Sequence, residues 1–247
     1  MSYEQFAFLY DELMSDVPYE KWVDFVEQQL QKQQVRAHKI LDLACGTGNI
    51  TLPLAKKGYT ITGADLSEDM LAVAQQKATG EGLSIPFYQQ DMTELELPER
   101  FDCITIFCDS LNYVLEEQGV QRTFQRVYEH LNTGGLFLFD VHSVYKVNEV
   151  FINETFAVNE DSVALIWNCF PGELPNSVEH ELTFFTQDIE KDMYRRFDEF
   201  HVQRTYSIQE LKDWLEEAGF SVQSITDGFE QTEVFDTTER IFFAAKK

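Results

Sequence analysis

The residues best suited to chemistry lie in the segment LDLACGTGNIT, residues 41–51. Asp42 lies within an apolar run, and small residues follow it at alternate positions as Ala44, Gly46 and Gly48. Small side chains let a ligand approach the backbone closely, and glycine tolerates a positive φ. If a helix begins after this turn, its free N–H groups can meet a polar or anionic ligand. A tight strand-to-helix turn without a ligand has the same pattern, so this segment alone leaves both interpretations open.

Two further carboxylates, Asp65 and Asp91, each follow a predicted strand. A carboxylate after the second strand can accept both hydroxyls of a ribose, and one after the third can meet an adenine amino group. The alternatives are a helix-capping acid at Asp65, for which Ser67 is the better candidate, and a solvated loop acid at Asp91. Because ligands of open α/β sheets bind at the carboxyl ends of the strands, the three acids predict a nucleotide-type site there.

Hydrophobic periodicity places these residues on alternating strands and helices. Five apolar runs are predicted strands, the last after a Gly134-Gly135 turn: 40–44, 59–64, 85–89, 101–107 and 136–141. Helical patterns precede and separate them: an aromatic segment within residues 1–15, then 22–34, segments ending near Lys57 and Lys77, and 118–131. Such alternation predicts βαβ units and a parallel sheet covered on both faces.

The alternation breaks after the fifth strand. Four β-rich runs separated by turn-prone pieces follow: 151–158, 163–170, 178–186 and 194–206. They predict an antiparallel β insertion over residues 143–204, within an α/β core of residues 1–142 and 205–247. A capping box opens the next helix at Ser207, Gly219 ends it, and strands near 221–226 and 240–245 close the chain.

The composition excludes several classes of partner. There are 19 Lys+Arg against 43 Asp+Glu, a formal net charge of −24. The excess is spread along the chain, so we expect no nucleic acid and no membrane as partner. The 4 cysteines form no CxxC pair and the 5 histidines lack ligand spacing, so we expect reduced thiols and no metal. Acids near the N-terminus and the lack of a long apolar stretch predict a cytoplasmic protein.

With these residues in place, the chain resembles the class I S-adenosylmethionine-dependent methyltransferases over about residues 1–142 and 204–247. Its loop departs from the family pattern in Ala44, where the first glycine is usual. LNTGGLFLFDV matches the family's segment before and through the fifth strand, and FAFLYDELM followed by DVPYEKW resembles the bacterial YqeM-like branch. The resemblance implies a Rossmann-like, seven-stranded sheet with an antiparallel last strand. It also implies S-adenosylmethionine as cofactor and S-adenosylhomocysteine as product.

The resemblance assigns residues to the parts of the cofactor. The loop and Tyr10 surround the methionine moiety, although Tyr10 could instead only staple the N-terminal helix. Asp65 holds the ribose, and Leu66, Met70, Asp91 and Met92 surround the adenine. The implied cofactor-binding residues are Tyr10, Asp42, Ala44, Cys45, Gly46, Gly48, Asp65, Leu66, Met70, Asp91, Met92 and Cys108.

Methyl transfer in this family is an in-line displacement at a sulfonium carbon, so the protein mainly aligns the nucleophile and excludes water. A base is needed only if the acceptor must lose a proton. No catalytic residue is assigned, and the acceptor-side candidates are Asp109, Asn112, Tyr113, His142 and His201. The insertion is predicted to form a lid over the acceptor. Arg195 and Arg196 either hold an anionic acceptor or, as we favour, make surface pairs with neighbouring acids.

These observations favour a methyltransferase acting on a small-molecule acceptor, as a monomer or homodimer, and leave the acceptor open. A cofactor-binding regulatory or assembly module without catalysis is the alternative, because no single residue is obligatory for methyl transfer. A nicotinamide-dependent dehydrogenase is disfavoured, since Ala44 and Asn49 occupy positions where that loop requires glycine.

Overall fold

The computed structural model describes Asp11 and residues 17–159, 163–188 and 193–247. Its helices and strands run, in chain order, as α2 (Tyr19–Lys32), β1 (Lys39–Leu43), α3 (Thr51–Lys56), β2 (Thr60–Asp65), α4 (Glu68–Gly80), β3 (Phe87–Gln89), η1 (Met92–Glu94), β4 (Phe101–Ile106), η2 (Ser110–Tyr113), α5 (Glu117–His130), β5 (Leu131–His142), η3 (Lys146–Phe151), β6 (Thr155–Asn159), β7 (Val163–Pro171), β8 (Ser177–Asp188), β9 (Met193–Arg204), α6 (Ile208–Glu217), β10 (Ser221–Asp227) and β11 (Arg240–Lys246). The helix expected in residues 1–15 lies outside the described residues, apart from Asp11.

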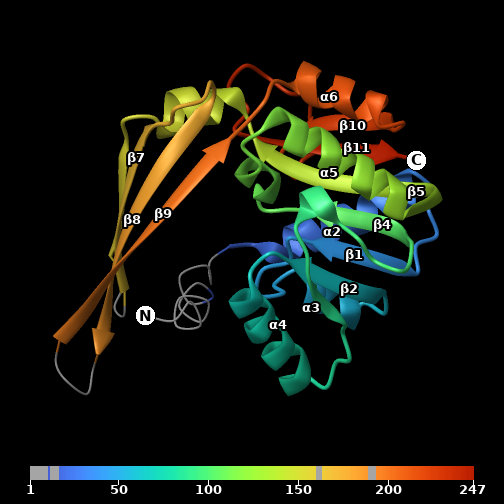
Figure 1. The fold of residues 1–247 in the computed structure, drawn as a ribbon, viewed down its shortest axis with the longest axis horizontal. Helices are drawn as coiled ribbons and strands as arrows, with labels where there is room; N and C mark the ends of the chain where they lie inside the picture. The colour runs from blue at the N-terminus through green and yellow to red at the C-terminus, as the bar shows by residue number, and fades with distance from the viewer. Residues whose placement is uncertain (1–10, 12–16, 160–162, 189–192) are drawn as a thin grey trace.

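A seven-stranded sheet in the order β10-β11-β5-β4-β1-β2-β3 forms the centre of the molecule (Figure 1). β1 pairs in parallel with β2 and β4, whereas β11 is antiparallel to both β5 and β10. The fold predicted from the sequence is therefore confirmed. The chain runs outward from β1 to β3 and then returns to β4 beside β1. This reversal of strand order is where open α/β sheets bind their ligands.

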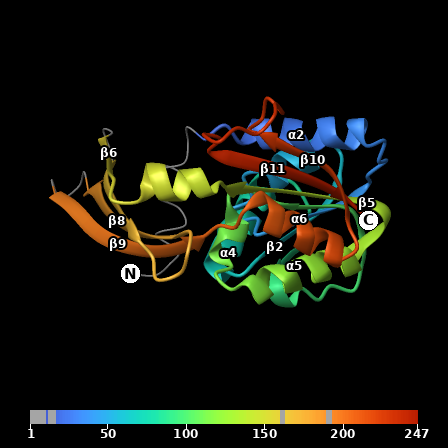
Figure 2. The same ribbon diagram turned by 90° about the horizontal axis from the view of Figure 1, so that it is seen from above.

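Helices cover both faces of this sheet, with α2 on one side and α5 and α6 on the other (Figure 2). The side chains of β5 alternate between the two faces, so both faces carry apolar side chains that the helices must cover. Phe137 and Phe139 pack in the cluster that α5 and α6 complete, and Leu136 and Leu138 pack in the cluster beneath α2. Full burial of such side chains contributes about 1.5–3 kcal/mol each, so the continuous apolar run of β5 fixes its central place.

The insertion after β5 is a four-stranded sheet in the order β6-β7-β8-β9, which projects from the core beside the carboxyl ends of the parallel strands (Figure 1). All its neighbouring strands are antiparallel, as expected. The predicted strand starting at residue 151 was wrong at its beginning. Phe151 ends the helical segment η3 instead, because its buried ring packs against His180 and Trp167. A left-handed residue, Asn153, then turns the chain into β6.

Two expectations about glycine and capping have different outcomes. β5 begins at Leu131, earlier than the predicted start at Leu136, and the Gly134-Gly135 pair lies within it. The pairing with β4 shifts between Leu131 and Leu136, where Gly134 is left-handed at φ +80°, and is regular from Leu136 onward. The Gly134 N–H donates to the Lys247 carbonyl at 2.9 Å, which holds this irregular segment against the chain end. At α6 the capping box is confirmed, since Ser207 and Glu210 each accept from the other's backbone N–H.

Candidate cofactor and acceptor site

The loop between β1 and α3 is left-handed at its small residues, with φ of +63° at Ala44, +53° at Gly46 and +83° at Gly48. A Cβ on Gly48 would lie 2.7 Å from Leu52 Cδ1, so this glycine lets α3 approach the loop. Among the described residues, by contrast, no atom lies within 4 Å of a Cβ built on Gly46. The loop is therefore packed at Gly48 and open at Gly46, where a ligand could approach the backbone.

Two buried groups support this loop from beneath. Asp42 accepts hydrogen bonds from the Thr51 and Thr105 hydroxyls at 2.6 and 2.9 Å, which ties β1 to α3 and β4. Burial raises the pKa of Asp42 to about 6, against the opposing effect of these two donors. Burial likewise raises the pKa of the Cys45 thiol, which remains protonated and unreactive. The structure thus gives Asp42 and Cys45 supporting positions.

Asp65 lies at the end of β2 and faces the loop. Its Oδ2 accepts from the Gly46 N–H at 2.8 Å and its Oδ1 accepts from the Ser67 N–H at 2.9 Å. Burial raises the pKa of Asp65, and these N–H donors oppose the rise. Each carboxylate oxygen keeps further acceptor capacity. Ser67 caps α4 by accepting from the Met70 N–H at 3.3 Å, which confirms it as the capping residue.

The residues expected around an adenine lie along the same edge. Leu66 is 65% exposed although it is apolar, and Met70 and Met92 are half-buried. Asp91 is exposed and caps η1, accepting from the Thr93 N–H at 2.7 Å. That contact is the one expected of a loop acid, so the structure brings Asp91 to the edge without giving it a special environment. Tyr10 lies outside the described residues.

Cys108 and Asp109 follow β4 in an unusual backbone conformation. Both are left-handed, with φ of +55° and +52°, which costs energy in residues other than glycine. Their N–H groups donate to the Asp140 carboxylate at 2.9 and 3.1 Å. Asp140 is fully buried and also accepts from the Trp22 indole at 2.9 Å and from Arg240. This buried carboxylate therefore holds the turn in place. Burial raises the pKa of the Cys108 thiol, so it is not a nucleophile.

Asp109 is the meeting point of three donors. Arg240 Nη2 donates to its Oδ1 at 2.8 Å, Gln203 Nε2 donates to its Oδ2 at 2.7 Å, and His142 Nε2 lies 3.3 Å from Oδ2. Burial opposes ionisation, but the charges of His142 and Arg240 hold the pKa of Asp109 far below its ordinary range. The carboxylate is ionised and engaged by donors, which makes it a poor base.

Asn112 lies inside the protein, in contrast to its expected place beside the acceptor. It is 2% exposed, its amide donates to the Arg204 carbonyl at 2.9 Å, and its Oδ1 accepts from the His142 N–H at 2.9 Å. These contacts join η2, β5 and β9. They favour a structural role.

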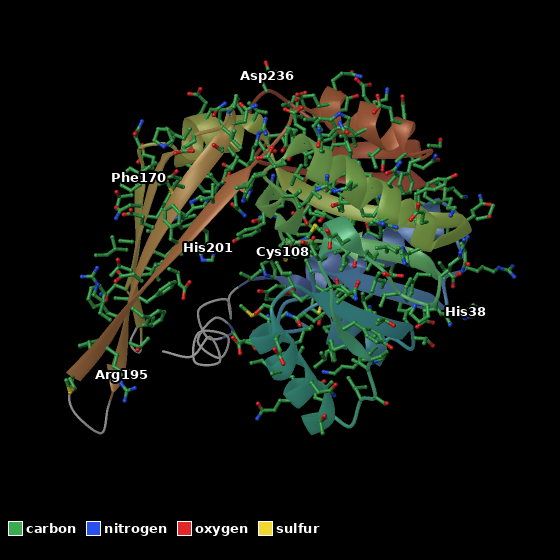
Figure 3. All side chains as sticks on the ribbon, viewed as in Figure 1. His38, Cys108, Phe170, Arg195, His201 and Asp236 are labelled. Carbon is green, nitrogen blue, oxygen red and sulfur yellow. The ribbon has the colours of Figure 1, made fainter. Side chains whose placement is uncertain are left out.

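Tyr113 and His201 meet where the two sheets face each other. Tyr113 Oη lies 3.5 Å from His201 Nδ1, and the rings pack edge to face. Tyr113 is 50% exposed, and Figure 3 shows His201 extending from β9 toward the side of the core that carries Cys108. Burial lowers the pKa of His201 and raises that of Tyr113. The pair is therefore a neutral imidazole beside a protonated phenol.

The inserted sheet also reaches Asp109 through a buried chain of hydrogen bonds. The Trp167 indole donates to His180 Nδ1 at 2.9 Å, and His180 Nε2 lies 3.2 Å from Gln203 Oε1. Burial lowers the pKa of His180 to about 4, so this imidazole is neutral. The residues that sequence reasoning missed are Asp140, His180, Gln203 and Arg240. The one available signal was Asp140, a lone acid inside an otherwise apolar strand.

Arg196 is confirmed as a surface pair, since its Nη2 donates to Asp198 at 2.8 Å and both side chains are exposed. Figure 3 places Arg195 toward the tip of the inserted sheet. Across the described ranges, no three or more His, Cys, Asp or Glu side chains are grouped to hold a metal ion. None of the helices in the described part of the chain is long and apolar enough to cross a bilayer.

The sheet order, the left-handed loop after β1 and the fixed carboxylate after β2 define the class I methyltransferase fold. Comparison with known proteins agrees, because residues 40–135 match the family model of a methyltransferase domain. The chain is 52% identical to a protein of Geobacillus sp. (strain WCH70), over 100% of both chains. It is 44% identical to YqeM of Bacillus subtilis (strain 168), over 100% of this chain and 98% of the other. Both relatives are named as methyltransferases.

A solved structure extends this likeness to the whole fold. The crystal structure of an S-adenosylmethionine-dependent methyltransferase from Clostridium acetobutylicum ATCC 824 superimposes with a TM-score of 0.90 at 34% identity, covering 99% of this chain and 98% of that one. The chain therefore belongs to the S-adenosylmethionine-dependent methyltransferases, in the branch that includes YqeM. The predicted enzyme class and cofactor are confirmed.

Proposed function

We propose that this methyltransferase acts on a small-molecule acceptor that binds between the edge of the seven-stranded sheet and the inserted sheet. The observation that carries the proposal is the Tyr113–His201 pair, in which a residue of the core and a residue of β9 meet at 3.5 Å. A site built from both sheets requires the insertion, residues 143–204, to act as the acceptor lid. The acceptor we infer is an amine or a hydroxyl, because either must lose a proton.

The residues at the sheet edge fit S-adenosylmethionine. Asp65 is aimed by the Gly46 and Ser67 N–H groups and has acceptor capacity left for ribose hydroxyls. The exposed apolar side chain of Leu66 beside it, together with Met70, suits a flat apolar base. The open backbone at Gly46 suits the methionine moiety. When bound, the cofactor supplies a methyl group on a sulfonium, a good leaving group.

The remaining proposed cofactor-binding residues shape the surroundings of this site. Asp42, Ala44, Cys45 and Gly48 shape the loop, and Asp140 fixes Cys108 at the end of β4. Asp91 and Met92 border the edge near the base. In this proposal the loop residues set the position of the cofactor, and the turn at Cys108 sets the wall that the acceptor meets.

On the acceptor side, His201 is the proposed proton acceptor. Its pKa is lowered by burial, so the imidazole is neutral at about pH 7. Tyr113 remains protonated and can orient the acceptor by a hydrogen bond. Asp109 cannot take this role because Arg240 and Gln203 already donate to it.

A methyl-transfer screen tests the acceptor side. The protein is incubated with isotope-labelled S-adenosylmethionine and fractionated cell metabolites, and products are read by mass spectrometry. His201→Asn should lower kcat by about 10²–10⁴-fold, the range for loss of a general base, and leave the Kd for S-adenosylhomocysteine unchanged. Full activity of this variant would refute the assignment. Cofactor binding without any labelled product from any fraction would favour the non-catalytic module.

A binding measurement tests the cofactor side independently. Asp65→Ala removes an ionised acceptor of two ribose hydrogen bonds, so the Kd for S-adenosylhomocysteine should rise about tenfold or more. The matched control is Glu68→Ala, an exposed acid in the first turn of α4, which should leave the Kd unchanged. Calorimetry gives both values. An unchanged Kd for Asp65→Ala would mean that Asp65 serves only the loop.

A further inference from the structure

A second set of side chains, separate from Asp65, contacts the loop between β1 and α3. Asp11 Oδ1 accepts from the Thr47 hydroxyl at 2.5 Å and from the Asn49 amide at 3.0 Å. Its Oδ2 accepts from Lys77 Nζ at 2.7 Å. Lys77 Nζ also donates to Asn49 Oδ1, at 2.6 Å. Residues from three separate parts of the chain therefore converge on one carboxylate.

The geometry of this cluster divides the loop in two. Thr47 and Asn49 flank Gly48 and direct their side chains to Asp11, whereas Gly46 directs its N–H to Asp65 at 2.8 Å. Thr47 is 2% exposed, so its contact with Asp11 is shielded from water. Asp11 and Lys77 are 26% and 30% exposed in their side chains, which leaves their attraction open to screening by salt.

The loop needs restraint because its conformation is unfavourable by itself. Ala44 is left-handed at φ +63°, and the two glycines that follow it are left-handed as well. Glycines lose more conformational entropy on ordering than other residues. A loop held at one end only would sample other conformations, and the fraction competent to bind would fall together with the apparent affinity.

We infer that Asp11 is a positioning residue for the cofactor, which with Lys77 locks the Thr47–Asn49 side of the loop into its binding conformation. The inference rests on the proposed cofactor site, since it presumes that the loop contacts the cofactor. Asp11 lies 36 and 38 positions before its loop partners Thr47 and Asn49, so cofactor affinity depends on a residue remote from the loop in sequence. Asp11 acts through the loop, and its contribution is to affinity.

The test uses the full chain and S-adenosylhomocysteine, which needs no acceptor. Asp11→Ala and Lys77→Met should each raise the Kd about tenfold, and the double variant should raise it by less than the product of the two single effects, because the Asp11–Lys77 contact is lost in both. In the wild type the Kd should rise between low and high sodium chloride, and in Asp11→Ala this dependence should disappear. The matched control is Glu81→Ala, which breaks the exposed Lys56–Glu81 pair of 2.8 Å at the end of α4, the helix that carries Lys77. This variant should change neither the Kd nor its salt dependence.

The outcomes separate this inference from the proposed function. If Asp65→Ala weakens binding but Asp11→Ala and Lys77→Met do not, the inference is overturned and the cofactor site stands. If none of the three weakens binding, the cofactor site itself is refuted, and this inference with it. A lower melting temperature of apo Asp11→Ala with an unchanged Kd would show a purely structural contact and would also overturn the inference. Weaker binding that loses its salt dependence, in a variant of wild-type melting temperature, supports it.

Discussion

Replacement of Arg240 by methionine should destabilise this protein far more than loss of a surface ion pair, because Arg240 pairs with two carboxylates at once. Its Nη2 donates to Asp109 at 2.8 Å and its Nη1 donates to Asp140, whose side chain is fully buried. Methionine replaces much of the apolar stem of arginine but lacks the guanidinium, so both carboxylates lose their shared cation. Removing one partner of a buried ion pair costs about 3–5 kcal/mol. Typical domains are stable by about 5–15 kcal/mol, so this loss is a large fraction of the total.

The loss should also depend on pH. Burial opposes the ionisation of Asp109, yet His142 and Arg240 hold its folded pKa below the unfolded value of about 3.9. Such a group contributes stability that is present above the unfolded pKa and is lost as the pH falls through the folded pKa. Without Arg240 the pKa of Asp109 should rise, and the carboxyl group should take up a proton at higher pH. The deficit of Arg240→Met relative to the wild type should therefore shrink as the pH falls from about 7 to about 4.

Equilibrium unfolding in urea, followed by circular dichroism and tryptophan fluorescence, measures this difference. Arg240→Lys should recover part of the loss, because it keeps the charge but not the two-pronged contact. The matched control is Arg126→Met, which breaks an exposed pair with Glu129 of 3.1 Å and should cost about 0.5 kcal/mol or less. A deficit for Arg240→Met below about 1 kcal/mol, or one independent of pH, would refute the reasoning.

Three further predictions follow from the structure. Ala44→Gly should stabilise the protein by about 0.5–1 kcal/mol, since relief of the φ of +63° outweighs the entropy of glycine; a lower melting temperature would contradict this. His180 has a folded pKa of about 4, below an unfolded value of about 6.5, so the slope that it adds to wild-type stability should be a loss of about 3 kcal/mol as the pH falls from about 6.5 to about 4, opposed in that range by Asp42, whose pKa burial raises to about 6. Urea titrations of His180→Gln should lack that slope, and an unchanged slope would exclude His180 as its source. Replacing residues 144–202 by a short Gly/Ser linker should spare S-adenosylhomocysteine binding, at a closure cost that grows only logarithmically with length, and abolish methyl transfer; calorimetric loss of binding would place part of the cofactor site in the insertion.

The strands were predictable because burial on both faces leaves a simple trace in the sequence. β4 and β5 are nearly continuous apolar runs, and both were located within a few residues except at the start of β5. The errors occur where tertiary contacts override local preference. Phe151 favours a strand by residue type, but its ring is buried against His180 in a helical segment. The Gly134 N–H donates to the carbonyl of Lys247, 113 positions away, and no local sequence pattern predicts this hydrogen bond.

The same limit separates the two halves of the site. The residues of the proposed cofactor half could be grouped from the sequence because Asp42, Gly46 and Asp65 follow one another within a single βαβ unit. The proposed acceptor half depends on pairings such as Arg240 with Asp109, which are 131 positions apart and meet because β11 lies beside β5. A lone buried acid must nevertheless find a cation or several donors. The chain has only 19 Lys+Arg, so few residues could be the cation that a buried acid needs. Asp140, an acid within an apolar strand, was therefore the sequence signal for that half of the site.

The chain of hydrogen bonds from the inserted sheet gives an independent statement about Asp109. A tryptophan N–H can only donate, so His180 Nδ1 must accept from Trp167 and Nε2–H must donate to Gln203. Gln203 then has its amide N–H₂ left for Asp109, at 2.7 Å. The Trp167 donor thus fixes the direction of the His180 bond, which in turn fixes that of the Gln203 bond, and Asp109 accepts at the end of the chain. Arg240 also donates to Asp109, and its positive charge favours the ionised carboxylate. Donors from the inserted sheet and from the core thus meet at one carboxylate, which supports the proposal that the inserted sheet is part of the acceptor site.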